Sequence, residues 1–494
     1  LFCLQRPCRR LNAILHLRRM AKKDKIGRSI LASFIASFGS ISFGYCMGYS
    51  SSALVDLTSP DTNSAIRLTS AQGSWFSSLV AVGAIFGCPI GGWAIDKFGR
   101  KRTLLLCSVP FELGWLLISF AQNRAMLYSG RISTGLACGI VSLATPVYIA
   151  EIAHPRKRGM LGSIGTLAIV IGFVISYLAG VLCQWNLLAF IGGVFPALLV
   201  TFLYFMPETP LWLLRKKKRT EALESLVWLR GTDGDTEEEC FNVESTIDHE
   251  KKLSLQDWLS PVIAKPLIIS IGLMIFQQLS GVAAVVFNTA SIFTVAGFSD
   301  GKLVSISVAL VQLLGCTLAC LAIDKTGRRI LLLTMSIAMS CTLFGLGTYF
   351  EIYIPPTGAN SSLDVTSLLG PISHSVPASK INWLSVVCIV LFNLFFALAW
   401  APVPWLIMSE IFPTQARGLC TSLATIANWL ALFIVTKTYN IMQTSMTIQG
   451  TYWFFGGCSI LGFVFVYMAM PETKGKTLKE IEAIFSKRVN DLPQ

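Results

Sequence analysis

Charged side chains and histidine are scarce in this chain. Asp, Glu, Lys and Arg make up 14% of its 494 residues, against roughly 25% in a soluble domain. Histidine occurs only four times, and the sequence holds no Ser/His/Asp arrangement and no phosphate-binding loop. The first shortage excludes a soluble protein. The second leaves no chemistry for an enzyme, so neither catalytic residues nor a cofactor are expected.

The sequence also lacks the cysteine spacing of a metal or redox site. Fourteen cysteines are present, but none forms a CxxC motif or a Cys/His group. Most of them, such as Cys46, Cys107 and Cys138, fall within apolar runs, where a thiol packs as a small hydrophobe. We predict that no cysteine is bridged and that no metal is bound.

Apolar residues, in contrast, are abundant. They make up 53% of the chain, and the mean hydropathy is +0.63. About 20 apolar residues in a helix cross the roughly 30 Å of hydrocarbon in a bilayer. The sequence therefore predicts an all-α membrane protein with twelve transmembrane helices. The twelve runs are 30–49, 73–95, 103–121, 126–149, 161–183, 186–206, 266–289, 302–323, 330–350, 383–408, 416–440 and 450–470.

The two halves of the chain share a set of motifs. The pattern D-K-x-G-R-[KR] occurs at residues 96–101 and again at 324–329. Further echoes follow in the same order: Glu151 precedes Arg158 by seven residues as Glu410 precedes Arg417, and Pro-Glu-Thr occurs at 207–209 and 471–473. Such duplication is typical of transporters whose halves rock against each other. It predicts two six-helix bundles related by a pseudo-two-fold axis.

The basic residues predict the orientation in the membrane. A net charge of +13 would favour a nucleic-acid partner in a soluble protein, but here Lys and Arg cluster in the loops after even-numbered spans. These loops and both termini are therefore predicted to be cytoplasmic, and no nucleic acid is expected. The sequon at Asn360 falls after an odd-numbered span, where a glycosylated residue must be exofacial. The two signals agree.

These boundaries divide the chain into five predicted parts. Within the insert between the halves, the apolar residues of 221–229 share one face, which favours a small helical domain over a flexible connection. Met20 is a candidate start, because the basic stretch before it has no signal-peptide core. The parts are a cytoplasmic arm (1–29), a six-helix bundle (30–206), a cytoplasmic helical linker (207–265), a second bundle (266–470, with an exofacial loop 351–382) and a cytoplasmic tail (471–494).

The junctions and one polar run carry a resemblance to a known family. The paired D-x-x-G-R-[RK] loops, the segments 148–152 and 408–413, and the run Gln277-Gln278-Leu279-Ser280-Gly281 resemble the sugar porter branch of the major facilitator superfamily. The segments 43–45, 106–111 and 428–430 are most similar to the class III facilitative hexose transporters of animals. This resemblance covers residues 28–486. It implies uniport of a neutral sugar, glucose or a related hexose, by alternating access.

Charged residues at the ends of the spans form a candidate cytoplasmic latch. Each exposed ion pair contributes only about 0–1 kcal/mol, which suits a latch between access states that differ by a few kcal/mol. A purely topological role for these charges does not explain the repeated Glu-to-Arg spacing of seven. The predicted network comprises Asp96, Arg100, Glu151, Arg158, Asp324, Arg328, Arg329, Glu410 and Arg417.

Amides and aromatic rings within the apolar spans form a candidate sugar site. Gln and Asn offer a donor and an acceptor to hydroxyl groups, and a ring packs against the apolar face of a pyranose. Singly, such a Gln could instead join two helices, and such a Trp could be an interfacial anchor. The resemblance places Gln277, Gln278, Trp405 and Asn428 in the central sugar site. The full predicted set adds Gln312, Thr166, Phe396 and Trp429.

Departures from the family pattern leave the substrate open. Ala283 stands where the family usually has Asn, and Thr166 stands where many hexose carriers have Gln. Trehalose or another disaccharide, a different polyol, and weakly bound glucose are the alternatives. Pro402 and Pro404 break the tenth span and free backbone groups that a cavity can use.

The coupling mode depends on two positions. Cys46 replaces the Asp that proton-driven sugar porters carry in the first span, and a thiol with an ordinary pKa of about 8.5 is a poor proton carrier near neutral pH. Uniport is therefore favoured. Glu112 in the third span is the candidate for proton symport, although a structural role is favoured because that span is peripheral in the family. A sugar sensor of the same fold is less favoured, because the tail 471–494 is short.

The expected partners follow from these predictions. They are a small neutral sugar and the lipid bilayer, and no obligatory protein partner is predicted. The membrane is the plasma membrane or an endosomal or lysosomal membrane.

Overall fold

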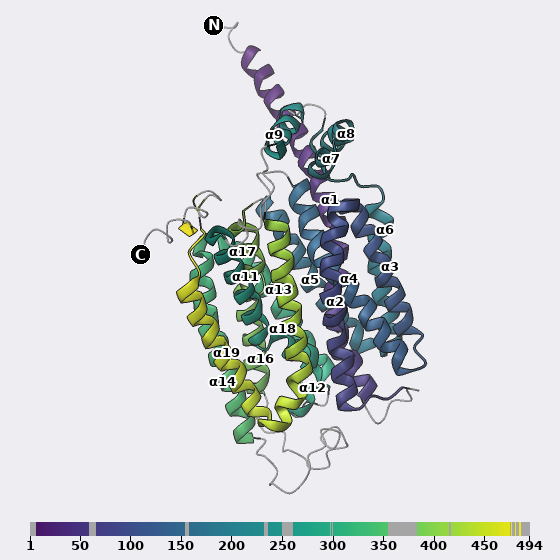
Figure 1. Cartoon of the computed structure of the whole chain (residues 1–494), viewed down its shortest axis with the longest axis vertical. Coiled ribbons are helices and arrows are strands. Elements are labelled where there is room, and N and C mark those ends of the chain that lie inside the picture. Colours follow the sequence, from purple (N-terminus) through teal and green to yellow (C-terminus); the bar gives the residue numbers. More distant parts are fainter. Residues whose placement is uncertain are drawn as a thin grey trace.

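A computed structural model gives the fold (Figure 1). It describes residues 6–58, 66–153, 158–231, 236–248, 260–296, 298, 300–353, 383–413, 416–474, 476, 480 and 484–485, without the side chains of 6–26, 158–160, 163, 246–248, 295, 324 and 409. Twelve helices in these ranges are long and apolar enough to span a membrane, which confirms the predicted all-α membrane fold. The predicted glycosylation site, Asn360, lies outside the described residues.

Six of these helices form the first half of the molecule. Two of their starts are fixed by side-chain caps: Thr69 and Gln72 form a capping box, and Asn123 accepts a hydrogen bond from the backbone N–H of Met126. The helices are α1 (Arg6–Thr58), α2 (Ser70–Phe98), α3 (Arg100–Ser119), α4 (Arg124–Ile152), α5 (Arg158–Leu182) and α6 (Trp185–Leu203).

The second half repeats this arrangement, but two of its spans are broken. The seventh span is interrupted at Gly281, which has a φ of +86°. The tenth is broken where Pro402 and Pro404 provide no backbone N–H, as these prolines predict. The elements are α11 (Pro261–Leu279), α12 (Val282–Val295), α13 (Gly301–Thr326), α14 (Arg328–Tyr353), α16 (Trp383–Phe395), the π-helix η2 (Phe396–Trp400), α17 (Val403–Ile411), α18 (Arg417–Ser445) and α19 (Thr447–Ala469).

Three short helices lie between the halves in sequence, α7 (Pro210–Arg215), α8 (Arg219–Arg230) and α9 (Thr236–Asp248). They dock on the first half. The Arg230 guanidinium donates to the carbonyl oxygens of Ile152 and Ala153, at 3.1 and 3.3 Å, and pairs with Glu239 at 3.1 Å. Arg28 of α1 donates to the carbonyl of Trp228. We call the end of the molecule that carries α7–α9 the linker face, and the other end the opposite face (Figure 1).

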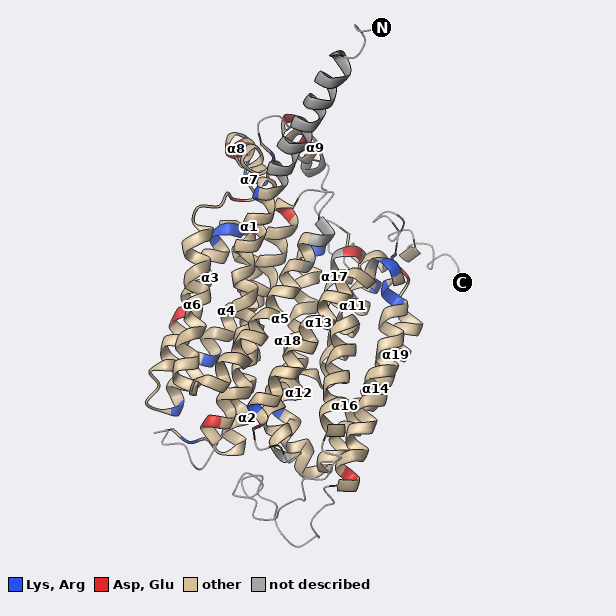
Figure 2. Ribbon diagram, turned by 180° about the vertical axis from the view of Figure 1, so that it is seen from behind, with Lys and Arg blue, Asp and Glu red and all other residues tan. Residues whose placement is uncertain are grey.

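Charges are distributed as a membrane protein requires. Figure 2 shows that most charged residues lie towards the linker face or the opposite face, whereas the middle of both halves is almost entirely uncharged. Leu113, Phe190 and Leu314 are among the large apolar side chains that remain exposed on the outside of the helices. In a bilayer these side chains face lipid, so their exposure carries no penalty.

At the opposite face, the two halves are joined by polar contacts. Lys302 Nζ of α13 lies 2.5 Å from Asp56 Oδ1 of α1, and both side chains are largely buried. Tyr177 of α5 donates to the carbonyl of Val286 at 2.8 Å. The other contacts are from the backbone N–H of Ala290 to Ser51, from Ser74 to the carbonyl of Lys437, and from Asn440 to Ser70. The structure is therefore one in which the halves are held together at this face.

We expect Lys302→Met to open the opposite face, because Asp56 then loses the cation of the other half. A pair of this kind contributes about 1 kcal/mol, so the open population should rise roughly fivefold. The measurement is the labelling rate of Val286→Cys by a membrane-impermeant maleimide, relative to the chain without that added cysteine. Lys302→Arg keeps the charge and should label at the original rate. Equal rates in both variants would show that the pair does not hold this face shut.

Candidate functional site

Three buried amides meet where the seventh span breaks. Gln277 and Gln278 lie in the last turn of α11, and Asn428 lies on the adjacent helix α18. Asn428 Nδ2 donates to Gln277 Oε1 at 2.7 Å, and Gln278 Nε2 donates to Asn428 Oδ1 at 3.2 Å. The structure thus brings together three of the residues predicted for the sugar site. We call Gln277, Gln278 and Asn428 the amide cluster.

A backbone carbonyl of the broken tenth span accepts a hydrogen bond from the amide cluster. In a regular helix the carbonyl of Trp400 would accept from the backbone N–H of residue 404, but Pro404 has none. Gln277 Nε2 takes that position and donates to the carbonyl oxygen of Trp400 at 2.6 Å. The proline therefore frees a carbonyl that orients the first amide.

One atom of the amide cluster remains without a partner. Both N–H groups of Asn428 are used, since the second donation from Nδ2 goes to the carbonyl of Met274 at 3.1 Å. Gln278 Oε1, in contrast, is buried and accepts no hydrogen bond from the described residues. An unsatisfied buried acceptor costs about 1–3 kcal/mol. A ligand that donates a hydrogen bond here would remove that penalty.

Aromatic side chains lie on α18, which carries Asn428, and on both sides of the break in the tenth span. Trp429 follows Asn428 on α18, is almost fully buried and packs against Phe43 of the first half with ring centroids 5.5 Å apart. Phe396 is buried in η2, and Trp405 is half-buried on α17. The Phe43–Trp429 contact bridges the two halves at the depth of the amides.

Two predicted residues stand apart from this group. Thr166 is half-buried on α5 and Gln312 is buried on α13. Their sequence neighbours Leu167 and Leu313 both pack against a small buried cluster of Val170, Cys316 and Ala397. No hydrogen bond joins either side chain to the amide cluster among the described residues.

A buried arginine that the sequence analysis did not single out lies in the first half. Arg131 of α4 is fully buried, and its guanidinium donates to the carbonyls of Phe76 and Cys46, each at 3.2 Å, and to the hydroxyl of Ser50. It also reaches the Cys46 thiol at 3.7 Å. A charged residue inside the fourth apolar run was the available signal, because such residues are functional candidates by default.

Glu112, the candidate proton carrier, lies at the periphery. Its side chain lines a groove of about 220 Å³ between α3 and α6, with Phe190, Gly193 and Val194. A Cβ atom on Gly193 would lie only 3.0 Å from Glu112 Oε2, so this glycine makes room for the carboxyl group. Because Phe190 and Val194 are exposed, the groove faces lipid rather than the other half.

The charged junctions form two equivalent ion pairs, one in each half. Arg100 Nη2 lies 2.8 Å from Glu151 Oε1, and Arg328 Nη2 lies 3.1 Å from Glu410 Oε1. Thr473 adds a hydrogen bond to Glu410 Oε2 at 2.7 Å. The repeat seen in the sequence is thus repeated in the contacts.

The other residues of the predicted latch are placed differently. Asp96 is exposed and only 4.0 Å from Arg100. Arg329 donates to the carbonyl of Tyr467 and lies over its ring. Arg417 donates to the carbonyl of Phe412. The side chains of Arg158 and Asp324 lie outside the described part of the structure.

A second carboxylate in each half was missed as a partner of these loops. Glu208 accepts from the backbone N–H groups of Arg100 and Lys101, at 3.0 Å each, and Glu472 accepts from those of Arg328 and Arg329, at 3.1 Å each. These N–H groups start α3 and α14, where a helix favours negative charge. Burial raises the pKa of the Glu208 carboxyl, and the N–H donors oppose this shift.

The glycines of the two loops explain why this arrangement fits. Gly99 and Gly327 have φ values of +99° and +93°, which favour glycine. A Cβ atom on Gly99 would lie 2.4 Å from Glu208 Oε2, and one on Gly327 would lie 2.9 Å from Glu472 Oε2. The D-x-x-G-R motif therefore ends one helix, starts the next and leaves space for a carboxylate at the start.

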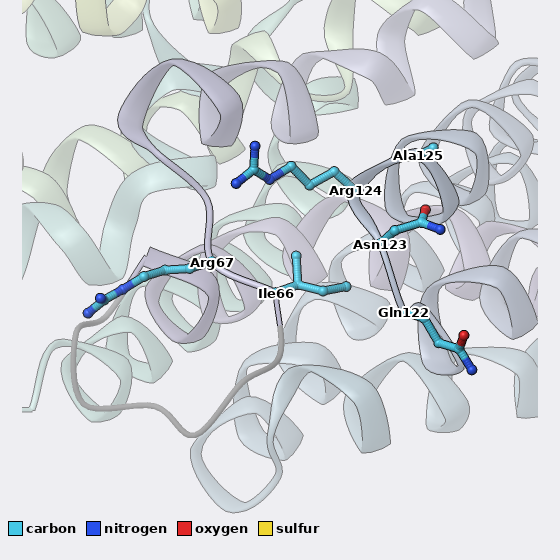
Figure 3. Close-up of a pocket in the computed structure, with 6 residues that line it drawn as sticks. All are labelled: Ile66, Arg67, Gln122, Asn123, Arg124 and Ala125. Atoms are coloured by element: carbon cyan, nitrogen blue, oxygen red, sulfur yellow. The ribbon is translucent and has the colours of Figure 1, made fainter.

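A surface pocket is remote from the amide cluster. Figure 3 shows its lining residues, which come from the segment before α2, the loop before α4 and the first turn of α4, and its volume is about 410 Å³. Arg67 and Asn123 are exposed, and the Asn123 side chain already caps α4. Since all lining residues belong to the first half, this pocket is not the candidate site.

Comparisons with known proteins give matches over nearly the whole chain. The family described as "Sugar (and other) transporter" matches residues 32–485. The chain is 40% identical over 472 residues to the mouse "Solute carrier family 2, facilitated glucose transporter member 8", covering 95% of this chain and 96% of the relative. It is 37% identical to the "Facilitated trehalose transporter Tret1" of Drosophila pseudoobscura pseudoobscura, covering 94% of this chain and 52% of the relative.

A solved structure gives the same fold. The proton:xylose symporter XylE bound to 6-bromo-6-deoxy-D-glucose superposes with a TM-score of 0.75 at 24% identity, covering 94% of this chain and 100% of the other. The inward-open form of XylE from E. coli superposes with a TM-score of 0.72, also at 24% identity, over 92% of this chain and 98% of the other.

We expect Glu472→Gln to destabilise the second half, because a neutral amide is a weaker acceptor at the start of α14. The charge-assisted contribution is about 1 kcal/mol. The measurement is the melting temperature of the purified chain in detergent, with the exposed Glu224→Gln in the middle of α8 as control. If both variants melt together with the unmodified chain, Glu472 does not cap this helix.

Proposed function

The chain belongs to the sugar transporter family, and from that premise we propose that it carries glucose or a related hexose across a membrane by facilitated, uncoupled transport. The name of the mouse relative, a facilitated glucose transporter, supports this choice of substrate and mode. The observation in the structure that carries the proposal is the buried, unpartnered Gln278 Oε1 in the amide cluster.

Sugar hydroxyls match what the amide cluster offers. A hydroxyl donates one hydrogen bond and accepts others, so it can donate to Gln278 Oε1 and accept from an amide N–H. The indoles of Trp405 and Trp429 offer apolar faces to the pyranose ring. A neutral ligand is favoured, because no charged side chain of the described residues contributes to the amide cluster.

Alternating access follows from how the halves are joined. The contacts at the opposite face close it, and the sugar in this state would exchange through the linker face. The pairs Arg100–Glu151 and Arg328–Glu410 stiffen the ends of the helices that must meet when the linker face closes. The loss of Glu410 would leave Arg328 without its carboxylate and disfavour that closure. In this proposal, the contacts at the opposite face are the weak latch between the halves, and each ion pair near the linker face joins helices within one half.

The surroundings of Cys46 and Glu112 support uncoupled transport. Cys46 lies beside Arg131, whose guanidinium donates to two carbonyls, the Ser50 hydroxyl and the Cys46 thiol and, within the described part of the chain, to no carboxylate. Glu112 faces the lipid-side groove, away from the route between the halves. Proton coupling needs an acid that is exposed to the cavity in alternation.

Trehalose is the second candidate substrate. The trehalose transporters among the relatives support it. So does Ala283, buried near the start of α12, because a short side chain there leaves more room than the usual Asn. A disaccharide needs such additional space beside the amide cluster.

The orientation and location are part of the proposal. We assign the linker face, both termini and the helices α7–α9 to the cytoplasm, on the basis of the positive loops. Asn360 would then carry a glycan on the exofacial side. The plasma membrane and the endosomal or lysosomal membranes are the proposed locations.

We expect Gln278→Ala to raise the KM for glucose uptake about three- to tenfold, because one hydrogen bond to the sugar is lost. Trp405→Ala should abolish most uptake by removing a stacking face. The measurement is uptake of labelled glucose, fructose and trehalose into proteoliposomes.

The matched control is Gln443→Ala on α18, whose amide donates to Tyr439 near the opposite face. It should leave KM unchanged. Saturable uptake of trehalose but not of glucose or fructose would identify trehalose as the substrate in place of a hexose. If none of the three sugars is taken up, the proposed function is refuted. Unchanged uptake in Gln278→Ala would remove Gln278 from the site.

Glu112→Gln should leave sugar uptake intact and independent of an imposed pH gradient. The reason is the position of Glu112 in a groove that faces lipid. The measurement compares accumulation with and without the gradient in the unmodified chain and in the variant. Gradient-driven accumulation that disappears in Glu112→Gln would identify the chain as a proton symporter.

A further inference from the structure

A buried serine outside the amide cluster is hydrogen-bonded to the indole of Trp400. Ser336 of α14 is fully buried, and its hydroxyl accepts from the indole Nε1–H of Trp400 at 2.9 Å. The same hydroxyl donates to the carbonyl of Leu332 at 2.7 Å. The serine hydroxyl therefore accepts one hydrogen bond and donates another, and the accepted bond orients the indole ring.

Trp400 has little freedom apart from this bond. Its ring is almost fully buried and lies against Gly462 of α19, where a Cβ atom would be only 3.4 Å away. Its backbone belongs to η2, in which the N–H of Ala401 donates to the carbonyl of Phe396 at 2.9 Å. The indole of Trp400 therefore connects α14 to the π-helix η2.

The carbonyl of this same residue orients Gln277. Pro404 leaves the Trp400 carbonyl without its helical donor, and Gln277 Nε2 occupies it at 2.6 Å. Gln277 Oε1 in turn accepts from Asn428 at 2.7 Å. Gln277 Nε2 also lies 3.5 Å from the carbonyl oxygen of Ala401, so the direction of this amide depends on where these two carbonyls of the broken span lie. Asn428 Oδ1 in turn accepts from Gln278, whose Oε1 is the atom of the cluster without a partner among the described residues.

We propose that Ser336 is a positioning residue of the sugar site, acting through Trp400 and Gln277 to set the direction in which the amide cluster presents Gln278 Oε1. This inference rests on the proposed sugar site. Ser336 itself touches no sugar. Its hydroxyl bonds the indole of Trp400, and this bond fixes the position of η2. The Trp400 carbonyl of η2 then orients the Gln277 amide.

Ser336→Ala leaves the indole N–H buried without an acceptor, so the indole and the π-helix shift towards another partner. D-glucose binding to the purified full chain in lipid nanodiscs should weaken about five- to tenfold, the equivalent of one misdirected hydrogen bond. Ser336→Thr keeps the hydroxyl and should bind within about twofold of the unmodified chain.

Ser340→Ala is the matched control. Ser340 lies one turn further along α14, is also buried, and donates to the carbonyl of Gly456 at 2.9 Å, away from Trp400. It should change thermal stability without changing glucose affinity. A merely structural Ser336 would behave in the same way, with fewer binding-competent molecules and an unchanged Kd.

A mutant cycle tests the route through Gln277. In a Gln277→Ala background, the further change Ser336→Ala should alter the Kd for glucose by less than about twofold, since the amide to be positioned is already gone. An equal fold-change in both backgrounds would overturn the inference. If Ser336→Ala is not recovered from the membrane, Trp400→Phe removes the other partner of the same bond and enters the same cycle.

The two proposals can fail separately. If the unmodified chain binds neither D-glucose nor trehalose, the proposed function fails. If it binds one of these sugars but Ser336→Ala and Ser340→Ala have the same Kd, the sugar site stands and the role of Ser336 is refuted.

Discussion

Inside a bilayer the backbone has no water to bond to, and this constraint decides where the chain can be anything other than a regular helix. Each carbonyl or N–H freed from a helix must find a partner within the protein. The tenth span breaks at Pro404, and the freed carbonyl of Trp400 is taken by Gln277. The amide cluster thus exists at the place where the helix ladder fails, and the failure itself supplies one of its hydrogen-bond acceptors.

The same constraint acts at the ends of the helices, where each half solves it in the same way. A glycine with positive φ ends one helix and starts the next, and a carboxylate from the Pro-Glu-Thr segment accepts the first N–H groups. The neighbouring arginine is left free to pair with a glutamate of a third helix. The same geometry in both halves therefore joins three helices at the same end of each half.

How far the sequence predicts this structure depends on the range of the interactions. The twelve spans and the broken tenth span follow from local composition, because length, hydropathy and proline act on their own neighbourhood. Gln277, Gln278 and Asn428 are recognisable as polar residues in apolar runs. That Arg329 turns to Tyr467, or that Glu208 caps α3, depends on a residue more than 100 positions away. The fully buried Arg131 was visible as an intramembrane charge, but its carbonyl partners were not.

The attachment of α7–α9 has a mechanical consequence. Arg28 on α1 and Arg230 on α8 join these helices to α1 and to the end of α4, so α7–α9 are attached to the first half. A protein or a modification that binds α7–α9 would therefore act directly on the first half. It would reach the second half only through the boundary between the halves.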